Sequence, residues 1–166
     1  MNELPEYKLE RIFDAPREMV WRAWTDPDLL NRWYGPGAET IIHKFELKPG
    51  GSWLNEMKWG EKSNYQKVIF QEVTQPEKLV WHHYSSIDSD WNELDDNPMM
   101  PDWPRVLLTT VIFKEISGKT NVCLTQVPMN ATDAELACFA DAMANMDHGW
   151  GGGYAVIDEI LAELKA

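Results

Sequence analysis

Residues 130–166 read NATDAELACFADAMANMDHGWGGGYAVIDEILAELKA. The segment opens with Thr132-Asp133-Ala134-Glu135, a capping-box pattern in which Thr132 accepts from the Glu135 amide and Glu135 reaches back. Apolar residues then recur at steps of three and four: Leu136, Phe139, Ala140, Met143, Met146, Trp150, Tyr154, Ile157, Leu161 and Leu164. This spacing predicts a single amphipathic helix of roughly 50 Å.

The middle of this predicted helix is rich in glycine. Gly149-Trp150-Gly151-Gly152-Gly153 places four glycines in five positions, and each costs about 1 kcal/mol relative to alanine in a helix. The run lacks the Lys-Ser/Thr of a phosphate-binding loop and does not follow a strand. Two interpretations remain open. The glycines allow close helix–sheet packing or a kink, or the missing side chains open a gap beneath the helix.

The rest of the chain has the pattern of strands. Residues 7–13 predict a first strand, and Pro16 and Asp26-Pro27 each begin a short helix. Period-two alternation then predicts strands near 39–47, 52–59, 64–74, 78–86, 105–115 and 119–127. Short turn-like breaks separate most of them, which favours an antiparallel meander. We therefore expect one α+β domain spanning 1–166, in which a curved seven-stranded antiparallel sheet wraps the long helix.

Composition narrows the choice of partners. The net charge is −12 without a Lys/Arg-rich run, so nucleic acid and anionic membrane surfaces are poor partners. No apolar run approaches the ~20 residues of a membrane span, and no signal peptide is visible at the N-terminus. Cys123 and Cys138 fit two small buried residues of a reducing compartment. A cytoplasmic protein is expected, with monomer and homodimer both open.

Residues 87–104 predict a long acidic loop, because they contain prolines and no regular periodicity. Trp91, Met99, Met100 and Trp103 suggest that part of it packs down. Asp88, Asp90 and Asn92 have the spacing that begins an EF-hand, but Glu93 and Met99 replace its glycine and final glutamate. His82 and His83 point to opposite faces of a strand. We expect no metal and no cofactor.

The nine tryptophans are the strongest local signal. Alternation places Trp53, Met57 and Trp59 on one face of a strand and Trp81 and His83 on one face of another. If these faces meet the apolar side of the long helix, they form either a solid core or an apolar pocket with a few polar groups.

Several strings in this order resemble the SRPBCC (START-like) superfamily. They are Phe13-Asp14-Ala15-Pro16, Val20-Trp21, Trp24-Thr25-Asp26-Pro27, Trp33-Tyr34-Gly35-Pro36, Leu47-Lys48-Pro49-Gly50-Gly51, Glu72-Val73, Pro76-Glu77-Lys78-Leu79-Val80, Thr120, Leu124-Thr125 and Gly149-Trp150. The ordered set looks most like the branch named for activators of the heat-shock-protein-90 ATPase. The resemblance implies a helix-grip fold, with a cavity between the sheet and the C-terminal helix. It implies no single activity and carries over no catalytic residue.

Three functional hypotheses follow. The first is the binding of a small hydrophobic or aromatic ligand, with His83 and Tyr154 as polar contacts. Its predicted lining is Trp53, Trp59, Trp81, His83, Trp103, Phe139, Met143, Met146, Trp150 and Tyr154. The second is a chaperone-associated module, although co-chaperones of that group carry a further N-terminal domain for which residues 1–6 leave no room. The third is a cyclase or hydrolase that uses His83 with Glu56 or an aromatic hydroxyl.

Overall fold

The computed structural model describes residues 4–35, 37–95, 97 and 100–166. Its elements are β1 (Tyr7–Phe13), α1 (Arg17–Thr25), α2 (Pro27–Trp33), β2 (Glu39–Phe45), β3 (Ser52–Trp59), β4 (Lys62–Thr74), β5 (Lys78–Ile87), β6 (Leu107–Ile116), β7 (Lys119–Pro128) and α3 (Asp133–Lys165). The predicted α+β fold is confirmed, including the two short helices after the first strand. The loop predicted to begin at residue 87 begins one residue later, because Ile87 is the last residue of β5.

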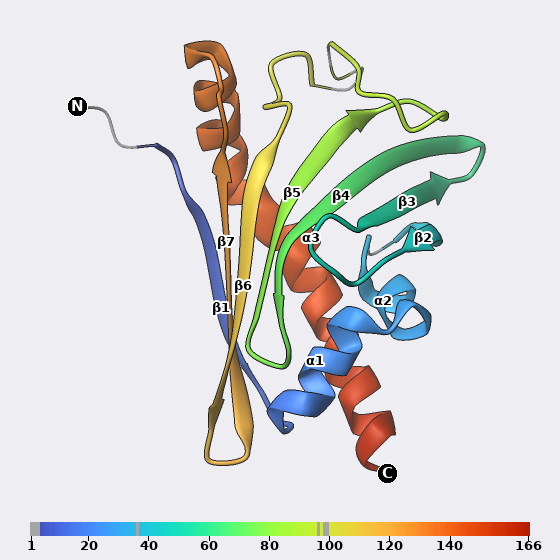
Figure 1. Cartoon of the computed structure of the whole chain (residues 1–166), viewed down its shortest axis with the longest axis vertical. Coiled ribbons are helices and arrows are strands. Elements are labelled where there is room, and N and C mark those ends of the chain that lie inside the picture. The colour runs from blue at the N-terminus through green and yellow to red at the C-terminus, as the bar shows by residue number, and fades with distance from the viewer. Residues whose placement is uncertain (1–3, 36, 96, 98–99) are drawn as a thin grey trace.

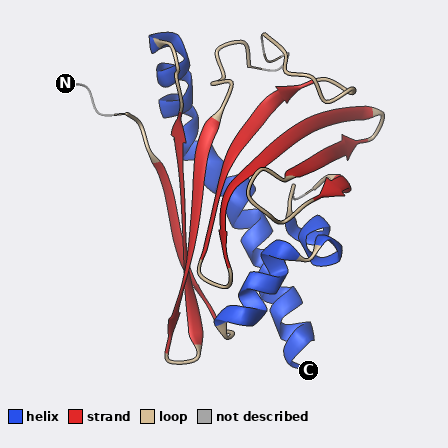
Figure 2. Ribbon diagram, viewed as in Figure 1, coloured by secondary structure: helices blue, strands red, loops and turns tan. Residues whose placement is uncertain are grey.

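The sheet is antiparallel throughout and has the strand order β1-β7-β6-β5-β4-β3-β2. Strands β2 to β7 form the predicted meander, and β1 joins beside β7. Figure 1 shows α3 passing diagonally behind the strands and meeting α1 and α2 along its C-terminal half. Figure 2 shows the strands bending as one continuous sheet next to these helices. One side of each strand therefore faces the helices, which explains the period-two pattern of burial.

Helix α3 is continuous over 33 residues, with Thr132 as its N-cap. The predicted capping box is present, since Thr132 Oγ1 accepts from Glu135 N at 3.1 Å and Glu135 Oε1 accepts from Thr132 N at 2.9 Å. Tyr7 ties β1 to the helix by donating from its hydroxyl to Asp147 Oδ1 at 2.6 Å. The glycine run therefore lies within a helix that neither ends nor restarts there.

The closest approach made possible by that run is to α2 rather than to the sheet. A Cβ on Gly153 would lie 2.7 Å from the carbonyl oxygen of Trp33, whereas a Cβ on Gly149 or Gly151 would meet nothing within 4 Å. Of Gly149, Gly151 and Gly153, the last alone thus has a steric requirement for glycine. The expected helix–sheet packing is replaced by helix–helix packing, because α2 sits between α3 and the strand β2.

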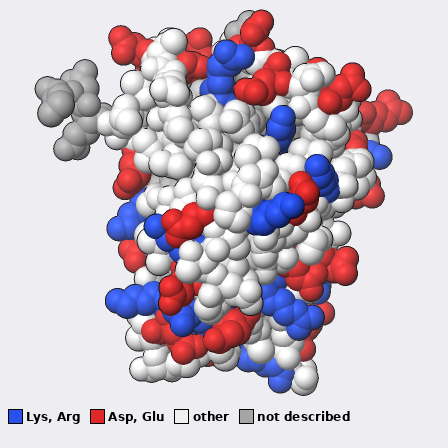
Figure 3. Space-filling view, viewed as in Figure 1, with Lys and Arg blue, Asp and Glu red and all other residues white. Residues whose placement is uncertain are grey.

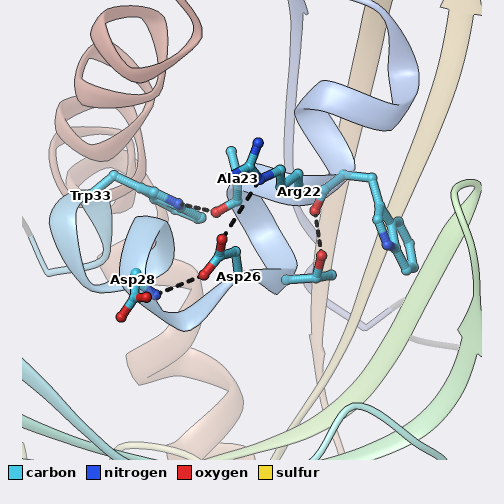
Figure 4. A network of polar contacts seen from close by, with 7 residues as sticks. Arg22, Ala23, Asp26, Asp28 and Trp33 are labelled. Carbon is cyan, nitrogen blue, oxygen red and sulfur yellow. Dashed lines mark hydrogen bonds and ion pairs between the residues drawn. The ribbon is translucent and has the colours of Figure 1, made fainter. Parts of the chain in front are cut away.

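Helices α1 and α2 are joined by a compact cap (Figure 4). Asp26 ends α1 and begins α2, accepting from Asp28 N at 3.0 Å and pairing with Arg22 at 3.6 Å. Proline at the first position of α2 suits the helix start, where no N–H partner is needed. The Trp33 indole N–H donates to the Ala23 carbonyl at 2.8 Å. This bond holds the C-terminal end of α2 against α1 and points Trp33 inward.

The loop after β5 packs on both sides of the sheet. Trp91 lies against His43 and Tyr65, with ring centroids 5.4 Å apart in each pair. Trp103 instead packs beside Phe139 of α3 at 5.6 Å. Part of the loop is therefore ordered against the domain, as the sequence suggests, although Met99 lies outside the described residues.

Charged side chains of both signs are interspersed on the face drawn in Figure 3, where Lys and Arg lie beside Asp and Glu. Ion pairs of the structure include Lys44–Glu46 at 3.2 Å and Lys78–Glu72 at 3.6 Å. Within the part of the chain that the structure describes, no helix has the length and apolarity to cross a membrane.

Candidate functional site

A cavity of about 250 Å³ lies between the sheet, the end of α2 and the middle of α3. Its lining consists of Trp33, Tyr34, Gly35, Met57, Gln66, His83, Ser85, Trp103, Leu107, Gln126, Asn145, Met146, Gly149 and Trp150. Asn145 and Gly149 are the exposed members of this set, so the cavity opens to solvent beside α3. The walls are largely aromatic and aliphatic, and none of these residues carries a formal charge except His83 if it is protonated.

A β-bulge shapes the polar side of the cavity. The pairing of β4 with β5 shifts between Tyr65–Ile87 and Lys67–Tyr84, so that Gln66 faces both Ser85 and Ser86. Bulges re-aim side chains and are frequent beside binding sites. Gln66 and Ser85 line the cavity here. The bulge thus places two polar side chains in an otherwise apolar wall.

Four side chains, three buried and one half-buried, form a hydrogen-bonded chain next to the cavity. The Trp81 indole N–H donates to His83 Nδ1 at 3.3 Å, and His83 Nε2 lies 3.1 Å from Gln66 Oε1. Since Nδ1 is the acceptor, the His83 proton must sit on Nε2, which donates to Gln66. Tyr34 also donates to Gln66 Oε1, at 2.6 Å. Both nitrogens of His83 are therefore paired within the protein.

Burial determines the ionisation of these groups. It lowers the pKa of His83 to about 4, because the charged imidazolium would lose its solvation in the buried position. It also raises the pKa of the Tyr34 hydroxyl, which stays protonated as the hydrogen bond requires. The cavity therefore has a neutral imidazole at physiological pH.

This shift predicts a dependence of stability on pH. The folded pKa of about 4 lies below the ordinary histidine pKa of 6.5, so the unfolded chain takes up the proton first as the pH falls. The stabilisation is complete above about pH 6.5 and declines as the pH falls toward 4. From about pH 7.5 to 5.5 we expect His83 to reduce the free energy of unfolding by about 1 kcal/mol.

Urea unfolding at stepped pH measures this loss in the parent protein and in two variants. His83→Gln should remove this pH-dependent loss of stability. His82→Gln should retain the loss, because His82 is a half-buried neighbour on the other side of β5. An unchanged pH dependence in His83→Gln would contradict the assignment.

The structure brings some of the predicted lining residues together and leaves others apart. His83, Trp103, Met146 and Trp150 line the cavity. The remaining buried members, Trp53, Trp81, Phe139 and Tyr154, belong to the solid core, and Met143 packs against that core. Trp59 is 45% exposed at the end of β3. Tyr154 is fully buried, its hydroxyl has no hydrogen-bond partner among the described residues, and it does not line the cavity.

Other lining residues were not anticipated from the sequence. Gln66 had a usable signal, since it lies two and four residues before the buried Val68 and Phe70 on β4. Ser85 likewise follows the inward-facing His83 by two residues. Trp33 and Tyr34 had no such signal, because their place in the wall depends on where α2 docks.

The family described as "Activator of Hsp90 ATPase homolog 1-like protein" matches residues 14–162. The chain belongs to this family. No curated protein matches the chain.

Several solved structures share the fold of this family member. Protein Ms6760 from Mycobacterium smegmatis is 22% identical, with a TM-score of 0.77 over 94% of this chain and 90% of its own. A protein from Arthrobacter aurescens is 21% identical, with a TM-score of 0.78 over 95% and 86%. NE0264 from Nitrosomonas europaea is 21% identical, with a TM-score of 0.72 over 96% of both chains. At these identities the likeness concerns the fold alone.

In this family member one of the two acid–base pairs suggested by the sequence, His83 with Glu56, does not form. Glu56 points away from the cavity, where its carboxylate accepts from Ser63 Oγ at 2.6 Å and from His43 Nε2 at 2.9 Å. The bond from Ser63, and then that from His43, lower the pKa of Glu56. The pairing of Glu56 with His83 is thus wrong, because adjacent positions of β3 alternate between faces and the even-numbered Glu56 faces outward.

The arrangement of possible metal ligands is also informative. Over residues 4–35, 37–95, 97 and 100–166, no three His, Cys, Asp or Glu side chains lie close enough to hold an ion. Cys123 and Cys138 are both free thiols. Burial raises the pKa of each thiol, so neither is poised as a thiolate nucleophile.

Proposed function

We propose that the protein binds a compact, uncharged apolar or aromatic molecule in the cavity between the sheet and α3. One observation carries this proposal: an open cavity of about 250 Å³ with aromatic walls and a few polar groups. Small-molecule sites have this anatomy. An apolar cavity of about 150 Å³ holds one benzene, so a bicyclic aromatic of roughly 12 non-hydrogen atoms is a suitable size here.

The enzyme and chaperone alternatives have less support. Acid–base catalysis would need a free nitrogen on His83, and both nitrogens are hydrogen-bonded within the protein. The chaperone-associated role is suggested by the family description alone. Ligand binding is favoured because it requires only the cavity that the structure contains.

The affinity is expected to be modest. For a ligand of this size, a dissociation constant of about 10–100 μM corresponds to roughly 0.5 kcal/mol per non-hydrogen atom, within the normal range. Titration with substituted naphthalenes, followed by the indole N–H resonances, measures it. The signals of Trp33, Trp103 and Trp150 should shift because these residues line the cavity. Trp59 and Trp91, which do not line it, serve as internal controls.

A blocking variant tests whether the cavity is the site. Gly149 lines the cavity and has open space around a Cβ, so the side chain in Gly149→Leu should occupy the cavity mouth. We expect at least a tenfold loss of affinity. Gly151→Leu is the matched control, since Gly151 has equal space and does not line the cavity. Unaltered binding by Gly149→Leu, or no probe binding to the folded parent protein, would overturn the proposal.

A further inference from the structure

The Gln66 side chain has a fixed orientation. Its oxygen accepts both from Tyr34, at 2.6 Å, and from His83, at 3.1 Å. Exchanging the amide oxygen and nitrogen would set an amide N–H against the N–H of His83 Nε2, while the Tyr34 hydroxyl would lose its acceptor. The proton on His83 Nε2 is itself determined by the bond from Trp81 to Nδ1. A chain of three residues therefore decides which end of the amide is the oxygen.

The other end of the amide remains available. Gln66 is a half-buried lining residue of the cavity, and its Nε2 donates to none of the described residues. An apolar ligand that displaced water there would leave the amide N–H groups without an acceptor, which costs free energy. A ligand with an acceptor at this point would avoid that cost.

The charge of the lining restricts the ligand further. Among the described residues, the lining contains no Asp, Glu, Lys or Arg, and its polar side chains besides Tyr34, Gln66 and His83 are those of Ser85, Gln126 and Asn145. A charged group enclosed there would lose hydration without gaining a counter-charge. The aromatic rings of Trp33 and Trp150, whose centroids lie 6.4 Å apart, also line the cavity. The ligand body that fits is therefore neutral and aromatic.

We infer that Gln66 selects uncharged aromatic molecules that carry a carbonyl or comparable hydrogen-bond acceptor, and that Tyr34 and His83 position Gln66 for this role. The inference rests on the proposed function, since it names the ligand class of the same cavity. Gln66 donates to the acceptor of the ligand, whereas Tyr34 and His83, which also line the cavity, orient the Gln66 amide.

Two probes of nearly equal shape isolate the hydrogen bond. In 2-acetylnaphthalene a carbonyl oxygen replaces one methyl group of 2-isopropylnaphthalene. Each is titrated into the full chain, and the ratio of the two dissociation constants is the readout. We expect the parent protein to favour the ketone by about fivefold to tenfold, as a single net hydrogen bond allows.

Two variants assign this preference to Gln66. Gln66→Glu keeps an acceptor for Tyr34 and His83 but loses the N–H donors, so the preference for the ketone should vanish. Tyr34→Phe removes one of the two groups that orient the amide, so the preference for the ketone should fall by less than in Gln66→Glu. Gln71→Glu makes the same charge change at an exposed position of β4 and should keep the parental ratio. Thermal unfolding checks that each variant is folded.

The outcomes separate the two ideas. Loss of the ketone preference in Gln66→Glu, with its retention in Gln71→Glu, supports the inference. Equal binding of both probes by the parent protein, or an unchanged ratio in Gln66→Glu, overturns the inference and leaves cavity binding intact. If neither probe binds the folded parent protein, the proposed function fails and the inference fails with it.

Discussion

Replacing Trp24 by alanine should lower the free energy of unfolding by about 3–5 kcal/mol. Trp24 is 3% exposed and lies where α1, α2, α3 and the sheet meet. Its ring contacts are Trp33 at 4.6 Å, Phe113 at 5.8 Å, Tyr154 at 6.0 Å, Trp150 at 6.2 Å and Trp81 at 6.5 Å. Alanine would leave a void bordered by all of these rings, and close-packed aromatic neighbours cannot collapse into it without losing their own contacts.

Trp24→Phe is the control for this prediction. The Trp24 indole nitrogen is buried without a hydrogen-bond partner among the described residues, so phenylalanine removes volume but no polar contact. We expect Phe to cost less than half as much as Ala. Urea unfolding gives both values. If the alanine variant lies within about 1 kcal/mol of the parent protein, Trp24 is not the centre of the core.

Replacing Gly153 by alanine should destabilise the protein by about 1–3 kcal/mol. The new methyl group would lie 2.7 Å from the Trp33 carbonyl oxygen and 3.0 Å from its Cε3 atom. The nearest obstacle is backbone, which yields only if α2 shifts. The gain in helix propensity of about 1 kcal/mol offsets part of this cost.

Gly151→Ala should have the opposite sign. Nothing lies within 4 Å of a Cβ at this position, so the helix gains about 0.5–1 kcal/mol from a less flexible unfolded chain. Thermal or urea unfolding of the two variants gives the comparison. A stabilising Gly153→Ala would show that α2 and α3 are not in close contact there.

The strand pattern was predictable because it depends on local alternation. On β5 the buried Leu79, Trp81 and His83 alternate with half-buried neighbours, and turn residues mark the ends of the strands. The outward direction of Glu56 follows from the same rule. The bulge at Ser85 and Ser86 is different, since it appears only in the register of β5 against β4.

The candidate site was less predictable from the sequence than the strands were. Alternation identifies residues that face inward, but it does not say whether the space in front of them is filled. Trp53 and Trp81 face inward and pack against each other, with ring centroids 5.9 Å apart, so they belong to the core. His83 shares their face of the sheet and reaches the cavity. The difference arises from α2, whose Trp33 and Tyr34 complete the wall.

Residues 130–166 by themselves determined a long capped helix with one apolar face, because capping and helical periodicity are properties of neighbouring residues. The structural role of each glycine is determined only by its contacts in the folded chain. Gly153 meets the Trp33 backbone, whereas Gly149 borders the cavity. These glycines lie four residues apart in one helix, and they differ because α2, more than one hundred residues earlier, covers only one of them. Sequence spacing carries no information on such a contact, since the docking of the whole domain determines the distance.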